Sequence, residues 1–242
     1  MNAIETIELT KKYKDTTAVD RLTLSVGEGE LLALLGVNGA GKTTTVKMLS
    51  CLSTPTSGEA YIFGKSVTRD ATYVKSVIAV SPQESATAPG LTVKENLELI
   101  CGVHGFDRES TKRKIAELNE SLSLVGIINK KAGKLSGGWQ RRLSIAMALI
   151  TEPRVLFLDE PTLGLDVIAR SELWDLIRAL KGRVTVVLTT HYMEEAEALS
   201  DRIAIMRDGK LLLCDTPEGI KTAAGVEDFE QAFIRIVRGE VQ

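Results

Sequence analysis

Apolar and polar positions follow two different patterns along this chain. Residues 4–9 and 22–26 alternate between the two kinds of side chain, which is typical of strands with one buried face. Residues 31–35 and 155–158 are continuously apolar instead, which is typical of parallel strands that are covered on both faces. The chain therefore combines half-buried strands with fully buried ones.

Further strands are predicted between these, and a hairpin is predicted near the C-terminus. Compact apolar or β-branched segments bounded by turn residues occupy residues 58–64, 77–81 and 184–190. Asp208-Gly209 separates two apolar runs, and this dipeptide is a strong hairpin signal.

Residues 87–135 have a helical pattern. Thr92-Val93-Lys94-Glu95 is a capping box, in which the threonine and glutamate side chains satisfy free amides at a helix start. Asp107 begins a second helix. Apolar residues at helical spacing are expected on the buried faces of both helices, at Leu97, Ile100, Val103, Ile115, Leu118, Leu122 and Val125. We therefore expect a mostly helical lobe between β-rich segments.

The segment Gly36–Thr44 matches the phosphate-loop pattern G-x-x-x-x-G-K-[ST]. It lies between a predicted buried strand and a predicted helix, which is the context that the pattern requires. Its glycines let backbone amides approach an anion, and the helix dipole favours phosphate there. Lys42 can reach the β- and γ-phosphates, and the Thr43 hydroxyl can hold Mg²⁺. We expect a nucleoside triphosphate site, with a simple glycine-rich turn as the alternative.

Two adjacent carboxylates end the buried strand at residues 155–158. Burying Asp159 and Glu160 is costly unless they meet a cation. Successive side chains of a strand diverge, so the two acids can have different tasks. Asp159 can bind Mg²⁺, whereas Glu160 can deprotonate an attacking water.

Gln83 and His191 each follow another predicted strand, at the edge where α/β proteins place ligands. Gln83 suits ligation of Mg²⁺ and detection of the γ-phosphate. His191 can hydrogen-bond the γ-phosphate and the attacking water. Taken alone, each would more often be a loop or structural residue.

Two other features are compatible with a nucleotide. Ser136-Gly137-Gly138 begins a predicted helix and offers free amides to a second anion, although serine and glycine commonly begin helices. Tyr13 lies in a predicted basic loop at residues 11–15, and its aromatic face can stack on a purine, with Val19 as an apolar neighbour. An ordinary surface tyrosine is the alternative.

Composition limits the remaining possibilities. The chain has 242 residues, 44% hydrophobic and 26% charged, which is ordinary for one globular α/β domain. A formal net charge of −2 argues against non-specific binding to nucleic acid or to anionic membrane. No apolar run approaches a membrane span, and the three cysteines have no metal-ligand spacing. We expect a cytosolic protein whose membrane role, if any, comes through a partner.

In this order, the motifs resemble those of the ATP-binding subunit of an ABC transporter, from Tyr13 to the strand pair after His191. The resemblance assigns the aromatic platform to Tyr13, Walker A to Gly36–Thr44, the Q-loop to Gln83, the signature to Leu135–Trp139, Walker B to Val155–Glu160, the D-loop to Leu163–Asp166 and the switch to His191. Each motif falls on the element that its mechanism needs.

The resemblance implies an α/β fold, a RecA-like P-loop NTPase core with an antiparallel β subdomain and an inserted helical subdomain. Residues 1–242 would form a single domain. Residues 1–86 and 136–242 would make the core with its N-terminal antiparallel lobe, and residues 87–135 the helical subdomain.

The resemblance also implies a set of site residues. The expected catalytic residues are Glu160, His191 and Lys42. The expected nucleotide-binding residues are Tyr13, Val19, Gly36, Asn38, Gly39, Ala40, Gly41, Lys42, Thr43, Thr44 and Gln83. Mg²⁺ would be held by Thr43, Gln83 and Asp159. Ser136, Gly137 and Gly138 would contact ATP bound by a second copy, beside Asp166 of the D-loop.

The implied function is hydrolysis of MgATP in a head-to-tail dimer that drives membrane permease subunits from the cytoplasmic face, without nucleic acid. Thr189–Glu197 and Pro89–Asn96 look most like the drug, polysaccharide and sodium exporter (ABC-2) branch. Val37 and Trp139 depart from the family pattern. The alternative is a soluble ABC-type ATPase acting on ribosomes or DNA; a small-molecule kinase would leave the signature, the D-loop and His191 without a role.

Overall fold

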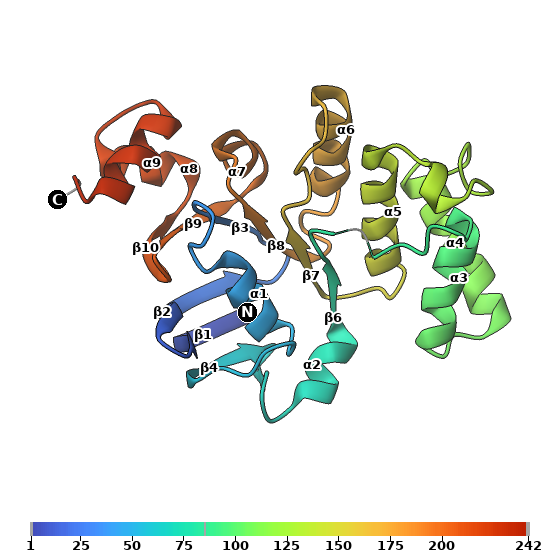
Figure 1. The fold of residues 1–242 in the computed structure, drawn as a ribbon, viewed down its shortest axis with the longest axis horizontal. Helices are drawn as coiled ribbons and strands as arrows, with labels where there is room; N and C mark the ends of the chain where they lie inside the picture. Colours follow the sequence, from blue (N-terminus) through green and yellow to red (C-terminus); the bar gives the residue numbers. More distant parts are fainter. Residues whose placement is uncertain (1, 85, 241–242) are drawn as a thin grey trace.

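The computed structural model of the chain describes residues 2–84 and 86–240 (Figure 1). The strands are β1 (Asn2–Tyr13), β2 (Thr16–Gly27), β3 (Leu31–Leu35), β4 (Ser57–Ile62), β5 (Lys65–Ser66), β6 (Ile78–Ser81), β7 (Val155–Asp159), β8 (Thr185–Thr190), β9 (Arg202–Arg207) and β10 (Lys210–Asp215). The helices are α1 (Lys42–Leu49), α2 (Ala71–Val77), α3 (Val93–Val103), α4 (Arg108–Ser121), α5 (Gly137–Leu149), α6 (Val167–Arg178), α7 (Met193–Leu199), α8 (Pro217–Ala224) and α9 (Phe229–Arg238), with a short 3₁₀ helix η1 (Ala132–Lys134).

A six-stranded sheet with the order β10-β9-β3-β8-β7-β6 forms the centre of the molecule. Strands β9, β3, β8, β7 and β6 run parallel to their neighbours, and only the β9–β10 pair is antiparallel. Leu35 pairs with Thr190, and Asp159 pairs with Thr189. The carboxyl ends of the central strands therefore lie together at one edge of the sheet.

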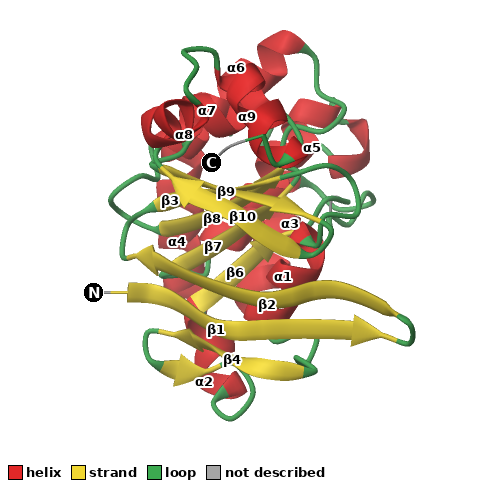
Figure 2. Ribbon diagram, turned by 90° about the vertical axis from the view of Figure 1, so that its left-hand side faces the viewer, coloured by secondary structure: helices red, strands yellow, loops and turns green. Residues whose placement is uncertain are grey.

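Side chains of the central strands alternate between two cores. Ala33 and Leu35 of β3 pack in one cluster with residues of α7, α8 and α9, whereas Leu32 and Leu34 pack in another with α1 and the antiparallel strands. Figure 2 shows the helices α5 to α9 on one face of this sheet and α1 on the other. Burial on both faces explains why the strand has no alternating pattern.

A second, four-stranded sheet with the order β2-β1-β4-β5 is antiparallel and lies beyond α1 (Figure 2). Strand β1 continues to Tyr13, which pairs with Thr16, so the expected loop over residues 11–15 is wrong. Only Lys14 and Asp15 form the turn. The last residues of β1 are polar or exposed, so they do not show the alternation of apolar and polar side chains by which the strand was predicted.

Helices α3 and α4 lie at the far end of the molecule from the C-terminus (Figure 1). The capping box at Thr92 and Glu95 is confirmed, and Asp107 caps α4 as predicted. Two expected core positions are wrong: Val103 is 74% exposed and Val125 is 68% exposed. Helix α4 ends at Ser121, so helical spacing does not extend to residue 125.

The C-terminal hairpin is confirmed. Asp208 and Gly209 both have left-handed backbone angles, with φ of 51° and 78°, as a two-residue hairpin turn requires. Helices α2 and α7 were not predicted, since each has only seven residues. Within the described residues, no helix is long and apolar enough to span a bilayer.

Candidate nucleotide-binding site

The phosphate loop connects β3 to α1 at the carboxyl edge of the central sheet. Gly39 and Gly41 have φ of 85° and 101°, a region that side chains rarely adopt. A Cβ atom on Gly36 would lie 2.3 Å from the carbonyl oxygen of Met206, so no side chain fits there. These glycines let the loop run close to β9 and leave its amides available to an anion.

Gly209 of the C-terminal hairpin braces this loop. Its amide donates to the carbonyl of Ala40 at 3.2 Å, and its own carbonyl accepts from the amide of Asp20 at 2.8 Å. The loop is thereby tied both to the β9–β10 hairpin and to β2.

Lys42 is the cation of the loop and is only 5% exposed. Its Nζ donates to the carbonyl oxygens of Gly36 and Val37 at 2.7 and 3.3 Å, and lies 3.4 Å from Oε1 of Glu160. The ammonium group is therefore held at the loop, in the position where it can meet phosphate oxygens. Val37 contributes only its backbone carbonyl to this arrangement.

Asp159 lies at the end of β7 beside two hydroxyl groups. The hydroxyls of Thr43 and Thr189 donate to its Oδ1 at 3.1 and 2.5 Å. A carboxylate and a hydroxyl suit Mg²⁺, which binds through few protein ligands together with substrate phosphates. This donor set fits the ion, although the described residues contain no cluster of three or more acidic, histidine or cysteine ligands.

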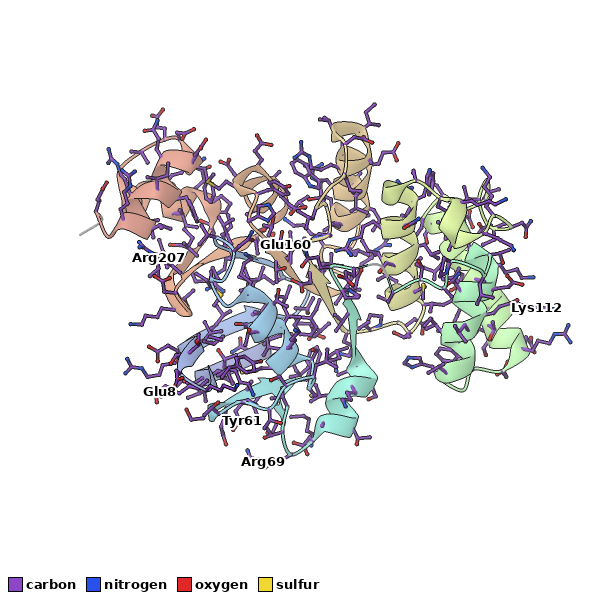
Figure 3. The ribbon with its side chains drawn as sticks, in the orientation of Figure 1. Glu8, Tyr61, Arg69, Lys112, Glu160 and Arg207 are labelled. Atoms are coloured by element: carbon purple, nitrogen blue, oxygen red, sulfur yellow. The ribbon has the colours of Figure 1, made fainter. Side chains whose placement is uncertain are left out.

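Glu160 and His191 form a hydrogen-bonded pair. Nδ1 of His191 lies 2.7 Å from Oε2 of Glu160. The backbone of Glu160 is left-handed, with φ of 48°, and its amide donates to both the carbonyl and the hydroxyl of Thr189. Figure 3 shows Glu160 near the centre of the molecule, where β7 meets the segment leading to α6. This unusual backbone turns the carboxylate toward Lys42 and His191.

Most of these groups line one cavity of about 430 Å³; Asp159 does not, but it is hydrogen-bonded to Thr43, which does. Its walls are formed by Tyr13, Ala18, Asn38, Gly39, Ala40, Gly41, Lys42, Thr43, Thr44, Gln83, Glu160, Leu163 and His191. Residues from six of the predicted motifs thus meet at one place. Tyr13 is 46% exposed at the rim, which leaves its ring accessible to a base.

The structure contradicts the prediction that Val19 contacts a nucleotide. Its side chain is fully buried in the core beneath the phosphate loop, because it points to the inner face of β2. Ala18, the residue before it, lines the cavity instead. Gly36 lies in the loop but likewise does not line the cavity.

The signature residues lie apart from this cavity. Ser136 is the N-cap of α5, and Ser136, Gly138, Trp139 and Asp166 line a separate hollow of about 310 Å³. Asp166 caps α6 by accepting a hydrogen bond from the amide of Ala169 at 2.9 Å. Gly137 begins α5 without lining this hollow. One chain therefore does not bring the signature to its own phosphate loop.

Trp139 packs against its own chain, beside Arg142. The guanidinium carbon of Arg142 lies 4.6 Å from the centre of the indole ring, and its Nη2 lies 3.2 Å from Oε2 of Glu172 on α6. A cation over an aromatic face is attractive. The unusual residue of the signature is thus anchored by neighbouring side chains.

Two buried polar residues behind the cavity, Arg141 and Glu195, were not predicted from the sequence. Arg141 of α5 is 4% exposed and bonds to the segments that carry Gln83 and Asp159. Glu195 of α7 accepts hydrogen bonds from Thr162 at 2.8 Å and Trp174 at 3.2 Å. Burial raises the pKa of Glu195.

The fold and the loop together define a P-loop NTPase with a RecA-like core, as predicted. The family model described as "ABC transporter" matches residues 19–163, and the chain belongs to this family.

Two relatives and one solved structure illustrate the similarity. The chain is 42% identical over 212 residues to "Phospholipid-transporting ATPase ABCA3" of Homo sapiens, covering 88% of this chain and 12% of that protein. It is 41% identical over 224 residues to "Daunorubicin/doxorubicin resistance ATP-binding protein DrrA" of Streptomyces peucetius, covering 92% of this chain and 68% of that protein. The ATP-binding cassette MJ0796, solved as a dimer "bound to ADP and Pi", is similar with a TM-score of 0.78 and 28% identity, covering 88% of this chain and 98% of that one. Similarity to the drug-resistance protein agrees with the predicted ABC-2 branch.

Proposed function

We propose that this chain binds and hydrolyses MgATP as the motor subunit of an ABC transporter. The observation that carries the proposal is one cavity lined by Lys42, by the Glu160–His191 pair and by Thr43, whose hydroxyl is hydrogen-bonded to Asp159. The Thr43–Asp159 pair can hold Mg²⁺, and the Glu160–His191 pair can activate the attacking water, which are two requirements of phosphoryl transfer to water. The relatives named above, an ATPase and an ATP-binding protein, support the same activity.

In this proposal the phosphate loop and Lys42 hold the phosphates of ATP, and Tyr13 stacks on adenine. Thr43, Gln83 and Asp159 hold Mg²⁺, which supplies charge neutralisation for the phosphates when bound. Asn38, Gly39, Ala40, Gly41 and Thr44 line the same cavity and complete the nucleotide contacts.

Glu160 accepts the proton of the attacking water in this proposal. The hydrogen bond from His191 orients the carboxylate and frees its other oxygen to face Lys42 and the water. The expected gain from such a base is about 10²–10⁴-fold in rate.

We also propose a dimer of two such chains, each closing the other's site. The hollow beside Ser136, Gly138 and Asp166 lies outside the nucleotide cavity of the same chain, which supports this arrangement. The free amides at Ser136, Gly137 and Gly138 would then meet the γ-phosphate bound by the partner copy. A homodimer is the simplest form of this assembly.

The membrane partner is a permease, docked on the cytoplasmic side. An apolar groove of about 490 Å³ supports this proposal and is lined by Leu52, Ile78 of β6, Ile100 of α3 and Met147 of α5. Leu52 is 68% exposed at its edge. Within the single domain of residues 1–242, the segment 87–135 acts as the helical subdomain on one side of this groove. Export is the proposed direction, as in the ABC-2 branch.

Release of phosphate from ATP by the purified chain tests the activity. We expect turnover with Mg²⁺ and none when EDTA is present in excess; turnover unaffected by EDTA would contradict the proposed Mg²⁺ role.

Sedimentation of the chain with membranes only when its permease is co-expressed tests the partner. A chain that instead sediments with ribosomes would favour the soluble ABC-type ATPase.

A further inference from the structure

Arg141 is a buried cation whose hydrogen bonds go to main-chain carbonyl oxygens. It lies in the first turns of α5, two residues after the end of the signature. Its Nε donates to the carbonyl of Pro161 at 2.8 Å, and its Nη2 donates to the carbonyl of Asp159 at 2.5 Å. Its Nη1 donates to the carbonyls of Pro82 and of Gln83, the latter at 3.2 Å.

The acceptors of Arg141 belong to two functional segments. Pro82 and Gln83 follow β6, whereas Asp159 and Pro161 flank Glu160 at the end of β7. Among the described residues, Arg141 bonds only to carbonyls, so the side chains of these two segments remain free for other contacts. The carboxylate of Asp159 still meets Thr43, and that of Glu160 still meets Lys42 and His191.

We infer that Arg141 is a positioning residue that joins the start of the signature helix to the backbone of the Gln83 and Asp159–Pro161 segments. This inference rests on the proposed ATPase function and its dimer. In that dimer the start of α5 contacts one ATP, while the segments held by Arg141 contact the other. Arg141 therefore links the two nucleotide sites through one rigid connection.

The choice of arginine supports this role over simple core packing. Burial lowers the pKa of the Arg141 guanidinium to about 10, which reflects the cost of holding a charge there. A buried charge is often less stabilising than an apolar residue of similar size. A planar guanidinium, however, can donate in several fixed directions at once, which the ammonium of lysine does not reproduce. The geometry uses this property to reach two segments simultaneously.

The test compares Arg141→Lys and Arg141→Met with the wild type and with Arg202→Lys. Arg202 on β9 is the control: it also donates to a main-chain carbonyl, that of Ser25 at 3.1 Å, but its partners among the described residues lie outside the segments that Arg141 holds. For each protein, ATP affinity, kcat, KM, the Hill coefficient for ATP and the melting temperature are measured on the full chain.

We expect both Arg141 variants to bind ATP with an affinity within about threefold of the wild type and to lose about 10²-fold in kcat, since small misplacements of reacting groups have effects of this size. The Hill coefficient should fall toward one. Arg202→Lys should keep the kcat and the Hill coefficient of the wild type, even if its melting temperature falls as much as that of the Arg141 variants.

The inference is overturned if a folded Arg141 variant hydrolyses ATP like the wild type, or if its loss of kcat is matched by Arg202→Lys at equal loss of melting temperature. It is also overturned if neither Arg141 variant folds, because the residue is then structural. Failure of the proposed function has a different signature, in which the wild type itself releases no phosphate.

Discussion

Two helix starts in this chain use the same physical device, but only one is surrounded by the groups needed for chemistry. At the start of α1, Lys42, Thr43 and Glu160 line one cavity with the phosphate loop, and Asp159 is hydrogen-bonded to Thr43. At the start of α5, Ser136 makes no capping hydrogen bond with its side chain. The difference agrees with the proposal that the first helix start binds ATP within the chain, whereas the second meets the phosphate bound by a partner copy.

The largest expected effect comes from removing the proposed base, Glu160, in the nucleotide cavity at the start of α1. Glu160→Gln keeps the size of the side chain but removes the proton acceptor, so turnover should fall about 10²–10⁴-fold while ATP still binds. Phosphate release and nucleotide binding measure the two properties separately. The variant should also accumulate as an ATP-bound dimer in gel filtration. Turnover at the wild-type rate would remove Glu160 from the base role.

The second effect tests the α5 side. Ser136→Arg places a long side chain at the helix start that is proposed to cover the partner's ATP. We expect loss of the ATP-dependent dimer and a fall in turnover of about 10²-fold, as when donors to a transition-state charge are removed. Each monomer should still bind ATP with unchanged affinity by calorimetry. Loss of that affinity would show that the two helix starts serve one site within the chain.

A smaller effect is expected at the rim of the α1 cavity. Tyr13→Ala removes the proposed stacking surface, and stacking contributes roughly 1–3 kcal/mol per base. Because Tyr13 is half exposed, we expect the lower part of this range, about a tenfold weaker affinity for ATP. Inorganic triphosphate, which has no base, is the control ligand. An equal loss of affinity for both ligands would exclude the stacking role.

The smallest effect concerns the polar groups buried behind the α1 cavity. Burial raises the pKa of Glu195, so the unfolded chain loses this proton at lower pH than the folded chain does. Stability should therefore decline as pH rises from the ordinary glutamate pKa, about 4.3, toward the raised value. Glu195→Gln can still accept hydrogen bonds from Thr162 and Trp174 through its amide oxygen, but it lacks the titration.

Urea unfolding of wild type and Glu195→Gln between pH 4 and pH 7 measures this decline. We expect the variant to gain stability relative to the wild type as pH rises. Parallel pH profiles for the two proteins would mean that Glu195 is ionised in the fold without cost.

Local sequence identified most of the α1 cavity because each motif is defined by short-range spacing and by a strand end. The parallel order of β6, β7, β8 and β3 then brings these ends to one edge. Val19 was assigned wrongly because its orientation depends on the inner face of β2, which is covered by the core beneath the loop. Arg141 was missed because its acceptors are carbonyls of segments about 20 and 60 residues away, and backbone acceptors carry no side-chain signal.

In the helical segment of residues 87–135 as well, local features were predicted correctly, whereas features that depend on distant contacts were not. The capping box at Thr92 predicted a helix start correctly, since it involves only neighbouring residues. Val103 and Val125 were expected in the core from spacing alone, but burial depends on where helices end and which elements cover them. Leu124, one residue before Val125, occupies the core position instead.

The contact between Gly209 and the phosphate loop has a consequence for protein engineering. Hairpin tips are usual places to insert affinity tags or reporter domains, because they tolerate added residues. Here the tip lies under the nucleotide loop, and a Cβ atom on Gly209 would already approach the carbonyl of Ala18 to 2.9 Å. Insertions at residues 208–209 should therefore weaken ATP binding. The turn at Lys14-Asp15 is exposed, but it follows Tyr13 at the rim of the nucleotide cavity, so an insertion there could also disturb the site. A reporter for this protein is better placed away from both turns, on the outer face of α4, where Lys112 points into solvent (Figure 3).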